Sequence, residues 1–386
     1  MAVKLAPSTK RRTAFHELTV AEVRRLTEDA IEVTFAVPEE LSGRFDYVPG
    51  QYVALRTTMD IDGEPKEVRR SYSICAEPQP GEIRVAIKKD LGGTFSTWAN
   101  EFLKAGDKLD VMSPMGQFIS KHPMTGLNSP ESIDTTTEHS FVAVAAGSGI
   151  TPVIAIARSV LAANPATRFD LIYANKAAMD VMFLEELADL KDRYPARFAL
   201  HHVLSREQRI SPLLSGRIDA EKLQTMLTSV IRTEEVDEWF LCGPFELVQL
   251  CRDTLAERGV APEKIRFELF TTGEPTKPEG QIGRPVKDDE NADSYSINFN
   301  LDGLQGTVSS PTHARESILN AALRVRPDVP FACAGGVCGT CRAKVVSGTV
   351  DMEENYALEP DELANGYVLT CQSRPTSPEV TVDYDA

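Results

Sequence analysis

Three cysteines stand close together near the C-terminal end of the sequence, in the stretch FACAGGVCGTCR that begins at Phe331. Cys333, Cys338 and Cys341 have the spacing C-x4-C-x2-C, and Cys371 follows after 29 intervening residues. This spacing is typical of the ligands of a 2Fe-2S cluster, for which one tight loop supplies three thiolates and a later segment supplies the fourth. The sequence therefore predicts an iron–sulfur centre that transfers one electron at a time.

The glycines between these cysteines support that interpretation. Gly335, Gly336 and Gly339 carry no Cβ atom, so backbone N–H groups can approach the sulfides of a cluster. The alternatives are a zinc site or buried free cysteines. Zinc sites usually combine one closely spaced cysteine pair with a second pair or with histidines, whereas Cys371 stands alone. We favour a plant-type 2Fe-2S cluster.

An electron carrier needs an electron source, and a motif in the N-terminal third fits a bound flavin. The motif is RSYS, which begins at Arg70. Arg70 can reach a pyrophosphate, Tyr72 can pack its ring on the flavin, and Ser73 can hydrogen-bond the isoalloxazine. Alternatively, these are ordinary strand residues.

A second flavin motif, GGTFS, lies about twenty residues downstream of the first. We expect a helix to begin at Thr97, so Gly93, Thr94 and Ser96 would stand at its N-terminus. The free N–H groups and the dipole of a helix N-terminus favour bound anions. An ordinary turn is the alternative. The motifs alone do not distinguish FAD from FMN.

The stretch GSGITP, which begins at Gly147, directly follows a continuous apolar run and fits the binding of a dinucleotide. It departs from the fingerprint G-x-G-x-x-G at its last position. Gly147 and Gly149 still allow a pyrophosphate to approach closely, and proline is well tolerated in the first turn of a helix. Thr151 lies in the same turn.

Two later segments would complete the nicotinamide site. Ser205 and Arg206 follow a predicted strand, where the guanidinium can hold a 2′-phosphate, and this favours NADPH over NADH. The alternative is that Arg206 is a solvated charged residue in a loop. Cys242, Gly243 and Pro244 end another strand and open a helix, at a point where a nicotinamide ring can lie.

The elements that would position these motifs change character along the chain. Between residues 18 and 118, alternating apolar residues such as Ile31, Val33 and Phe35 predict half-buried strands of an antiparallel barrel or sandwich. From Phe141, continuous apolar strands alternate with helical patterns. That alternation predicts a doubly wound parallel α/β sheet.

These patterns predict a multidomain chain. The expected parts are a disordered tail (1–12), an antiparallel β-barrel that binds the flavin (13–121), a loop (122–140), an α/β NAD(P)-binding domain (141–270), a linker (271–293) and an α+β ferredoxin domain of the β-grasp type (294–386).

The amino-acid composition excludes several classes of protein. A chain of 386 residues with 42% hydrophobic and 25% charged residues is typical of a globular protein with two or three domains. A net charge of −16 argues against nucleic acid and suits a basic patch on another protein. Three cysteines remain outside the cluster motif, an odd number that does not suggest a disulfide framework, so we expect a reducing cytoplasm. We find no signal peptide or apolar span for a membrane.

Taken together, these motifs resemble the ferredoxin–NADP reductase superfamily up to about residue 270, followed by a plant-type ferredoxin. Within it the chain is most similar to the family of reductase subunits of bacterial ring 1,2-phenylacetyl-CoA epoxidases. The segments that carry this similarity are FHELTVAEV, SYSICAEPQPGEIRVAIK, GRIDAEKLQ and ENYALEPDELANGYVLTCQ. The resemblance implies FAD, NADPH and a partner oxygenase with a di-iron centre.

The same resemblance implies roles for particular residues. Glu268 and Phe270 would lie near the flavin edge, and Ser73, Cys242 and Glu268 would take part in catalysis. Electrons would pass from NADPH through FAD and the 2Fe-2S cluster to the oxygenase. Two alternatives stay open: the reductase of another oxygenase, such as an aromatic-ring dihydroxylating or alkane/alkene system, and a non-enzymatic iron–sulfur redox sensor.

Overall fold

A computed structural model describes residues 4–5, 15–61, 63–90, 92–116, 118–122, 137–231, 233–270, 293–301, 304–326, 329–331, 336, 339, 341–353, 355, 358 and 360–386. The chain divides into two compact units. One comprises Phe15–Val68 and Tyr72–Gly273, and the other Met1–Ala14, Arg69–Ser71 and Glu274–Ala386. Within the described residues, no helix has both the length and the apolar character needed to cross a membrane.

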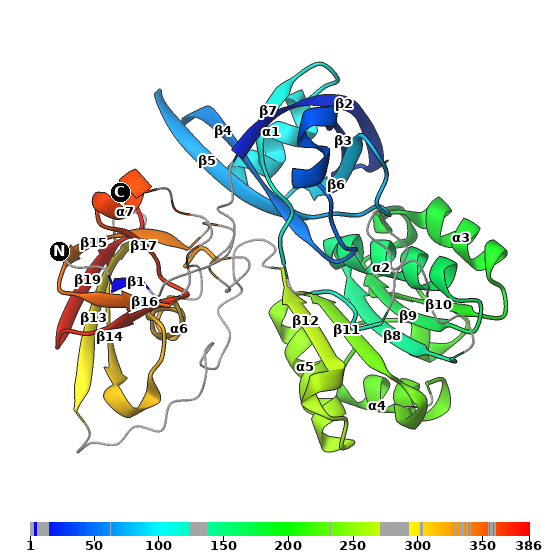
Figure 1. The fold of residues 1–386 in the computed structure, drawn as a ribbon. Coiled ribbons are helices and arrows are strands. Elements are labelled where there is room, and N and C mark those ends of the chain that lie inside the picture. The colour runs from blue at the N-terminus through cyan, green and yellow to red at the C-terminus, as the bar shows by residue number, and fades with distance from the viewer. Residues whose placement is uncertain are drawn as a thin grey trace. The chain divides into compact units, whose positions relative to one another are not determined.

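The first domain of the larger unit consists of antiparallel strands and one helix (blue to cyan in Figure 1). Its elements are β2 (Phe15–Thr27), β3 (Ala30–Ala36), η1 (Glu39–Arg44), β4 (Tyr52–Ile61), β5 (Glu64–Ser73), β6 (Glu82–Lys88), α1 (Thr94–Phe102) and β7 (Lys108–Met112). The strand order is β5-β4-β7-β2-β3-β6. A bridge between Ile74 and Val85 joins the end of β5 to β6, so the sheet closes into a barrel.

Strand β3 differs from the half-buried strand that the alternation predicts. Ile31, Val33 and Phe35 are buried as expected, but Glu32 and Thr34 on the opposite face are buried as well. The reason is that the outer face of the barrel is covered. Residues of that face, including Ala30, Cys75 and Ala86, belong to one apolar cluster with residues of the nucleotide domain.

The second domain of this unit alternates strands and helices (green in Figure 1). Its elements are β8 (Ser140–Ala146), η2 (Gly147–Gly149), α2 (Ile150–Ala163), β9 (Arg168–Asn175), η3 (Ala178–Asp180), α3 (Leu184–Arg193), β10 (Phe198–Leu204), η4 (Pro212–Leu214), α4 (Ala220–Ser229), η5 (Thr233–Glu235), β11 (Glu238–Gly243), α5 (Phe245–Glu257), η6 (Pro262–Lys264) and β12 (Ile265–Leu269). All pairs in the sheet are parallel, in the order β10-β9-β8-β11-β12.

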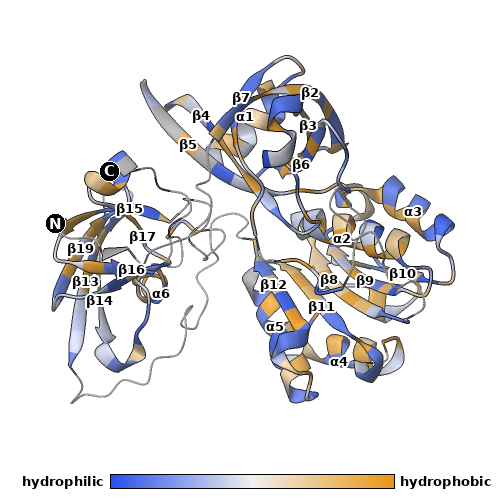
Figure 2. Cartoon of the chain, viewed as in Figure 1, coloured by the Kyte–Doolittle hydropathy of each residue, from blue (hydrophilic) through white to orange (hydrophobic). Residues whose placement is uncertain are grey.

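This sheet is covered on both faces, as the apolar strands predict. Helices α2 and α3 pack in one apolar cluster, and α4 and α5 pack in another on the opposite face. In Figure 2 the helices carry both hydrophobic and hydrophilic stretches, because only one side of each faces the sheet. The strand order switches between β8 and β11, because β9 and β10 follow on one side of β8 and β11 and β12 on the other. Ligands of such folds bind at the carboxyl ends of the strands at that point.

The second unit contains a mixed sheet and short helices (yellow to red in Figure 1). Its elements are β1 (Lys4–Leu5), β13 (Ser294–Leu301), β14 (Leu304–Pro311), η7 (Thr312–Ala314), α6 (Ile318–Leu323), β15 (Arg342–Ser347), β16 (Val350–Met352), α7 (Pro360–Ala364), β17 (Tyr367–Leu369), β18 (Ser373–Pro375) and β19 (Glu379–Asp383). The main sheet has the order β14-β13-β19-β15-β17, and β1-β16-β18 form a second sheet. Within the N-terminal tail, Lys4–Leu5 pairs with β16.

Candidate functional site

The glycine turn between β8 and α2 lies directly against the end of β11. A Cβ atom added to Gly149 would stand 2.2 Å from the carbonyl oxygen of Cys242, and one added to Gly243 would stand 3.2 Å from Ala146. Gly147 and Gly243 have φ values of 53° and 152°, which residues with a side chain rarely adopt. Gly149, one of the two glycines predicted to allow close approach of a pyrophosphate, thus also allows the turn to lie against the end of β11, whereas a Cβ atom at Gly147 would meet nothing within 4 Å.

Thr151 lies in the first turn of α2 and is buried. Its hydroxyl donates to the carbonyl oxygen of Ser148 at 3.0 Å, inside the glycine turn. Pro152 follows it, in the position that tolerates proline because the N–H there has no partner within a helix. The N-terminus of this fourteen-residue helix therefore fits an anionic group.

The three residues predicted to be catalytic lie together. The hydroxyl of Ser73, at the end of β5, donates to a carboxylate oxygen of Glu268 on β12 at 3.2 Å. Glu268 is the register partner of Cys242 on β11. Burial, and secondarily the Glu268 carboxylate, raise the pKa of the Cys242 thiol well above its usual range. Cys242 is thus a neutral thiol, suited to packing rather than nucleophilic attack.

Helix α1 begins at Thr94, three residues earlier than predicted, and Gly93 is its N-cap. Gly93, Thr94 and Ser96 therefore do stand at a helix N-terminus. The Ser96 hydroxyl accepts from the N–H of Asp90 at 3.1 Å and donates to the carbonyl oxygen of Gly93 at 3.3 Å. These bonds hold the loop that precedes the helix, so the loop and the helix N-terminus form one unit.

The other residues of the two predicted cofactor sites are more dispersed. Tyr72 packs at 5.8 Å from the ring of Phe95. Pro244 is the N-cap of α5, and the N–H of Phe270 donates to the carbonyl oxygen of Gly243 at 2.9 Å. Arg70 is exposed on β5 and is grouped with the other compact unit, so its place in the flavin site stays a prediction.

Ser205 and Arg206 lie at the carboxyl end of β10, on the same edge of the sheet as the glycine turn. Their N–H groups donate to the carbonyl oxygens of Asn175 and Lys176 at 2.9 and 2.7 Å. These bonds hold the loop against the end of β9. The side chain of Arg206 is exposed and accessible to a phosphate.

Two of the four predicted cluster ligands lie in the described part of the ferredoxin domain. Cys341 and Cys371 are both buried in the same apolar cluster. The N–H and hydroxyl of Thr370 donate to the carbonyl oxygen of Cys341 at 3.1 and 2.9 Å, which draws the two segments together. Cys333 and Cys338 lie outside the described residues. The two buried thiols fit a 2Fe-2S cluster.

The cluster loop also needs its glycines. Gly336 and Gly339 have φ values of 80° and 72°, in the left-handed region that other residues rarely adopt. The sequence motif predicted a glycine requirement here from the need for close approach, and the backbone conformation adds a second reason.

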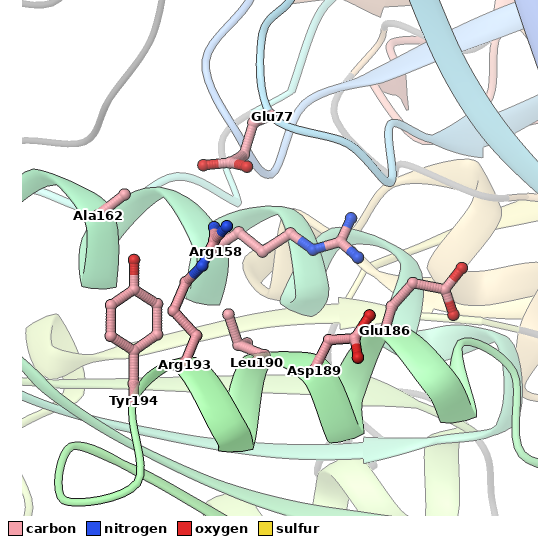
Figure 3. Close-up of a pocket in the computed structure, with 8 residues that line it drawn as sticks. All are labelled: Glu77, Arg158, Ala162, Glu186, Asp189, Leu190, Arg193 and Tyr194. Carbon is pink, nitrogen blue, oxygen red and sulfur yellow. The ribbon is translucent and has the colours of Figure 1, made fainter.

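A cavity of about 410 Å³ lies elsewhere, between side chains of α2 and α3 (Figure 3). It is lined by Glu77, Arg158, Ala162, Glu186, Asp189, Leu190, Arg193 and Tyr194. None of the predicted site residues is among them. Glu186 is paired with Arg24 of the barrel, which also pairs with the buried Glu32. This cavity is a charged seam between the barrel and the nucleotide domain, and we assign it no ligand.

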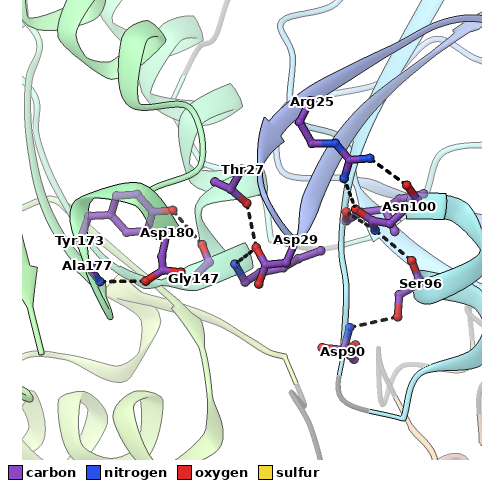
Figure 4. Close-up of polar contacts among 12 residues, drawn as sticks. Arg25, Thr27, Asp29, Asp90, Ser96, Asn100, Gly147, Tyr173, Ala177 and Asp180 are labelled. Atoms are coloured by element: carbon purple, nitrogen blue, oxygen red, sulfur yellow. Dashed lines mark hydrogen bonds and ion pairs between the residues drawn. The ribbon is translucent and has the colours of Figure 1, made fainter. Parts of the chain in front are cut away.

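Two supporting residues were missed in the sequence (Figure 4). Asn100 on α1 donates to the carbonyl oxygens of Ser96 and Ile87 and accepts from Arg25. Tyr173 on β9 donates to the carbonyl oxygen of Gly147 at 2.9 Å. A tyrosine at the end of the buried run Leu171–Tyr173 was the available signal, because a buried hydroxyl needs a partner.

Three protein families match consecutive parts of the chain. The oxidoreductase FAD-binding domain matches residues 17–119, the oxidoreductase NAD-binding domain residues 143–253, and the 2Fe-2S iron-sulfur cluster binding domain residues 300–376. These matches confirm the predicted fold classes and their order. They also decide between FAD and FMN, which the motifs left open.

Similar proteins align with almost the whole chain. A subunit of the 1,2-phenylacetyl-CoA epoxidase of Escherichia coli is 43% identical and covers 97% of this chain and 99% of its own. The 3-ketosteroid-9-alpha-monooxygenase ferredoxin reductase component of Rhodococcus rhodochrous is 32% identical, with coverages of 95% and 96%. The solved structure of phthalate dioxygenase reductase aligns with a TM-score of 0.52 over 96% of this chain and 98% of its own; at 21% identity this likeness concerns the fold alone.

Proposed function

We propose the function of this chain from one premise: it belongs to the ferredoxin–NADP reductase superfamily, in the branch with a C-terminal plant-type ferredoxin domain. It is an oxidoreductase with FAD-binding, NAD-binding and 2Fe-2S domains. We infer that NADPH is its electron donor and that a di-iron oxygenase, the 1,2-phenylacetyl-CoA epoxidase, is its acceptor. The whole-length similarity to one of the subunits of that epoxidase supports this acceptor.

One observation carries the electron-transfer part of the proposal. The hydrogen bond between Ser73 and Glu268 joins the end of the flavin-domain strand β5 to the nucleotide-domain strand β12, beside Cys242. When bound, FAD takes two electrons from the nicotinamide and the 2Fe-2S cluster passes them on singly. This contact brings residues of the two domains together, which supports a transfer between groups bound to each. Hydride transfer requires no acid–base pair.

The residues of the chain would then divide the binding between them. Tyr72, Ser73 and the N-terminus of α1 would hold FAD, and Arg70 would reach its pyrophosphate. The glycine turn and the first turn of α2 would hold the dinucleotide pyrophosphate, and Arg206 the 2′-phosphate. The ligands of the cluster would be the four cysteines of the motif, Cys333, Cys338, Cys341 and Cys371.

We also propose a cytoplasmic location. The cysteines outside the cluster motif, Cys75, Cys242 and Cys251, are buried free thiols, which suits a reducing compartment.

A second acceptor is favoured by a specific observation. The ketosteroid monooxygenase reductase component covers nearly as much of the chain as the epoxidase protein does, at lower identity. The reductase of another oxygenase therefore remains the competing proposal. The two are separated by supplying the purified chain and NADPH to either oxygenase and measuring product. We expect turnover with the phenylacetyl-CoA epoxidase, and product only with the steroid oxygenase would reverse the assignment.

Replacement of one cluster ligand tests the order of electron transfer. Cys338→Ser should remove or destabilise the cluster while flavin absorbance is retained, because the flavin domain is separate. The variant should still reduce ferricyanide with NADPH and should fail with the oxygenase. Cys251→Ser, a buried thiol on α5 outside the motif, is the matched control. Normal oxygenase turnover by Cys338→Ser would show that electrons leave by another route.

A further inference from the structure

The glycine turn Gly147–Gly149 has two consecutive carbonyl groups that are held by side-chain hydroxyls. The Tyr173 hydroxyl donates to the carbonyl oxygen of Gly147 at 2.9 Å (Figure 4). The Thr151 hydroxyl donates to the next carbonyl oxygen, that of Ser148, at 3.0 Å. Thr151 belongs to the helix turn that follows directly, whereas Tyr173 comes from the neighbouring strand, where it is the register partner of Ala145.

Holding a carbonyl group also orients the N–H group that follows it. A trans peptide unit is planar, with its C=O and N–H pointing in opposite directions, and the described peptide bonds include no cis bond. A bond to the oxygen of Gly147 therefore directs the N–H of Ser148 away from Tyr173. The bond from Thr151 to the oxygen of Ser148 likewise directs the N–H of Gly149 away from the Thr151 hydroxyl.

The backbone N–H of Ile150 also donates to the Gly147 carbonyl oxygen, but the turn is rich in glycine, so the hydroxyls add support to this orientation. Gly147 has φ 53°, and a glycine also populates the opposite sign of φ at little cost. Rotation of the peptide unit between Gly147 and Ser148 would present a carbonyl oxygen in place of an N–H group. An oxygen in that place repels an anion, whereas an N–H group at a helix N-terminus attracts one.

Tyr173 is well placed to prevent this rotation. It has no solvent exposure, and it packs in the apolar cluster of β8, β9 and α2. Its hydroxyl is the only polar part of the side chain, so phenylalanine would fill the same space and lose only that group. The ring fills its place in the apolar cluster, and the hydroxyl, which also lies near Asn175 and Met182, donates to the turn.

We propose that Tyr173 is a positioning residue for the pyridine dinucleotide, and that its hydroxyl holds the Gly147 carbonyl so that the turn presents N–H donors to the pyrophosphate. The inference rests on the proposed nucleotide site. Tyr173 does not itself contact the dinucleotide; it acts through the backbone of the turn.

The test compares Tyr173→Phe with Tyr47→Phe. Tyr47 is also buried and also donates to a backbone carbonyl oxygen, that of Ala76 at 3.2 Å, but it lies in the barrel. Affinity for NADP⁺ and NAD⁺ is measured by titration calorimetry, FAD content by absorbance, and kcat and KM by ferricyanide reduction. Loss of one hydrogen bond should weaken binding of the preferred dinucleotide by roughly three- to tenfold in Tyr173→Phe.

The remaining readouts separate positioning from stability. We expect KM to rise with kcat and FAD content little changed in Tyr173→Phe, and unchanged dinucleotide affinity in Tyr47→Phe. Equal dinucleotide affinity in Tyr173→Phe and the wild type would overturn this inference and leave the proposed function standing. So would a Tyr173→Phe variant that fails to fold while Tyr47→Phe folds, because the hydroxyl then serves stability. If the wild type binds neither dinucleotide, the proposed function fails and the inference with it.

Discussion

Gly149→Ala should disable the nucleotide site while it leaves the flavin domain intact. A Cβ atom at this position would stand 2.2 Å from the carbonyl oxygen of Cys242, 2.6 Å from its carbon and 2.9 Å from the nitrogen of Gly243. All three are backbone atoms, so no side chain can turn away. Ordinary contacts begin at 3.4 Å, and α2 and β11 must therefore separate by about 1.2 Å, the difference between 3.4 and 2.2 Å.

A displacement of that size matters because hydride transfer depends on placement. Misplacement by about 1 Å can cost on the order of 10²-fold in rate, and overpacking typically costs about 1–3 kcal/mol of stability. We therefore expect kcat/KM for NADPH, measured by ferricyanide reduction, to fall by up to about 10²-fold, with FAD content near that of the wild type.

The matched control is Gly43→Ala. A Cβ atom there meets nothing within 4 Å, and Gly43 is not among the glycines with positive φ. This variant should keep the wild-type kcat/KM and melting temperature. A folded Gly149→Ala protein with kcat/KM within twofold of the control would refute the argument that the turn and β11 must touch.

Two further predictions concern charge. Arg206→Ala should lower the preference for NADPH over NADH by on the order of tenfold or more, because a charge-assisted contact contributes roughly 1.5–3 kcal/mol. The ratio of the kcat/KM values for NADPH and NADH measures this preference. An unchanged ratio would assign the discrimination to another residue. Reversal of the exposed Asp351 and Asp361 to Lys should slow electron delivery to the oxygenase and flatten its dependence on salt, with ferricyanide reduction unchanged. Oxygenase rates equal to the wild type from ~20 to ~300 mM salt would leave these acids a purely solubilising role.

The acidic stretch between residues 351 and 362 illustrates what the sequence could not predict. It contains six acids and no basic residue. In the structure, Glu353 pairs with Arg374 and Glu362 pairs with Arg342, so arginines distant in the sequence neutralise part of the charge. Glu354 and Glu359 lie outside the described residues. For this reason Asp351 and Asp361 test a docking surface better than Glu353.

The parts of the site that could be predicted from the sequence were the motifs that depend on the local backbone conformation. Glycine turns before helices carry their own signal where φ is positive, as at Gly92 and Gly147, because few other residues suit that conformation. The bond between Ser73 and Glu268 joins positions 195 apart, and the role of Tyr173 depends on which strand lies beside β8. Periodicity reports which residues are buried, but it does not report their partners across a sheet or between domains.

The same limit explains the error at β3 and shows what it means for function. Alternation predicted one solvated face, but that face packs against the nucleotide domain through Ala30, Cys75 and Ala86. Arg24 adds a polar link, because it pairs with the buried Glu32 on its own side and with Glu186 of α3 on the other. Hydride transfer tolerates only displacements well below about 1 Å. The flavin site and the nicotinamide site must therefore be held in fixed positions relative to each other. A shared apolar core holds the flavin and nucleotide domains together, and burial of a strand on both faces is its structural consequence.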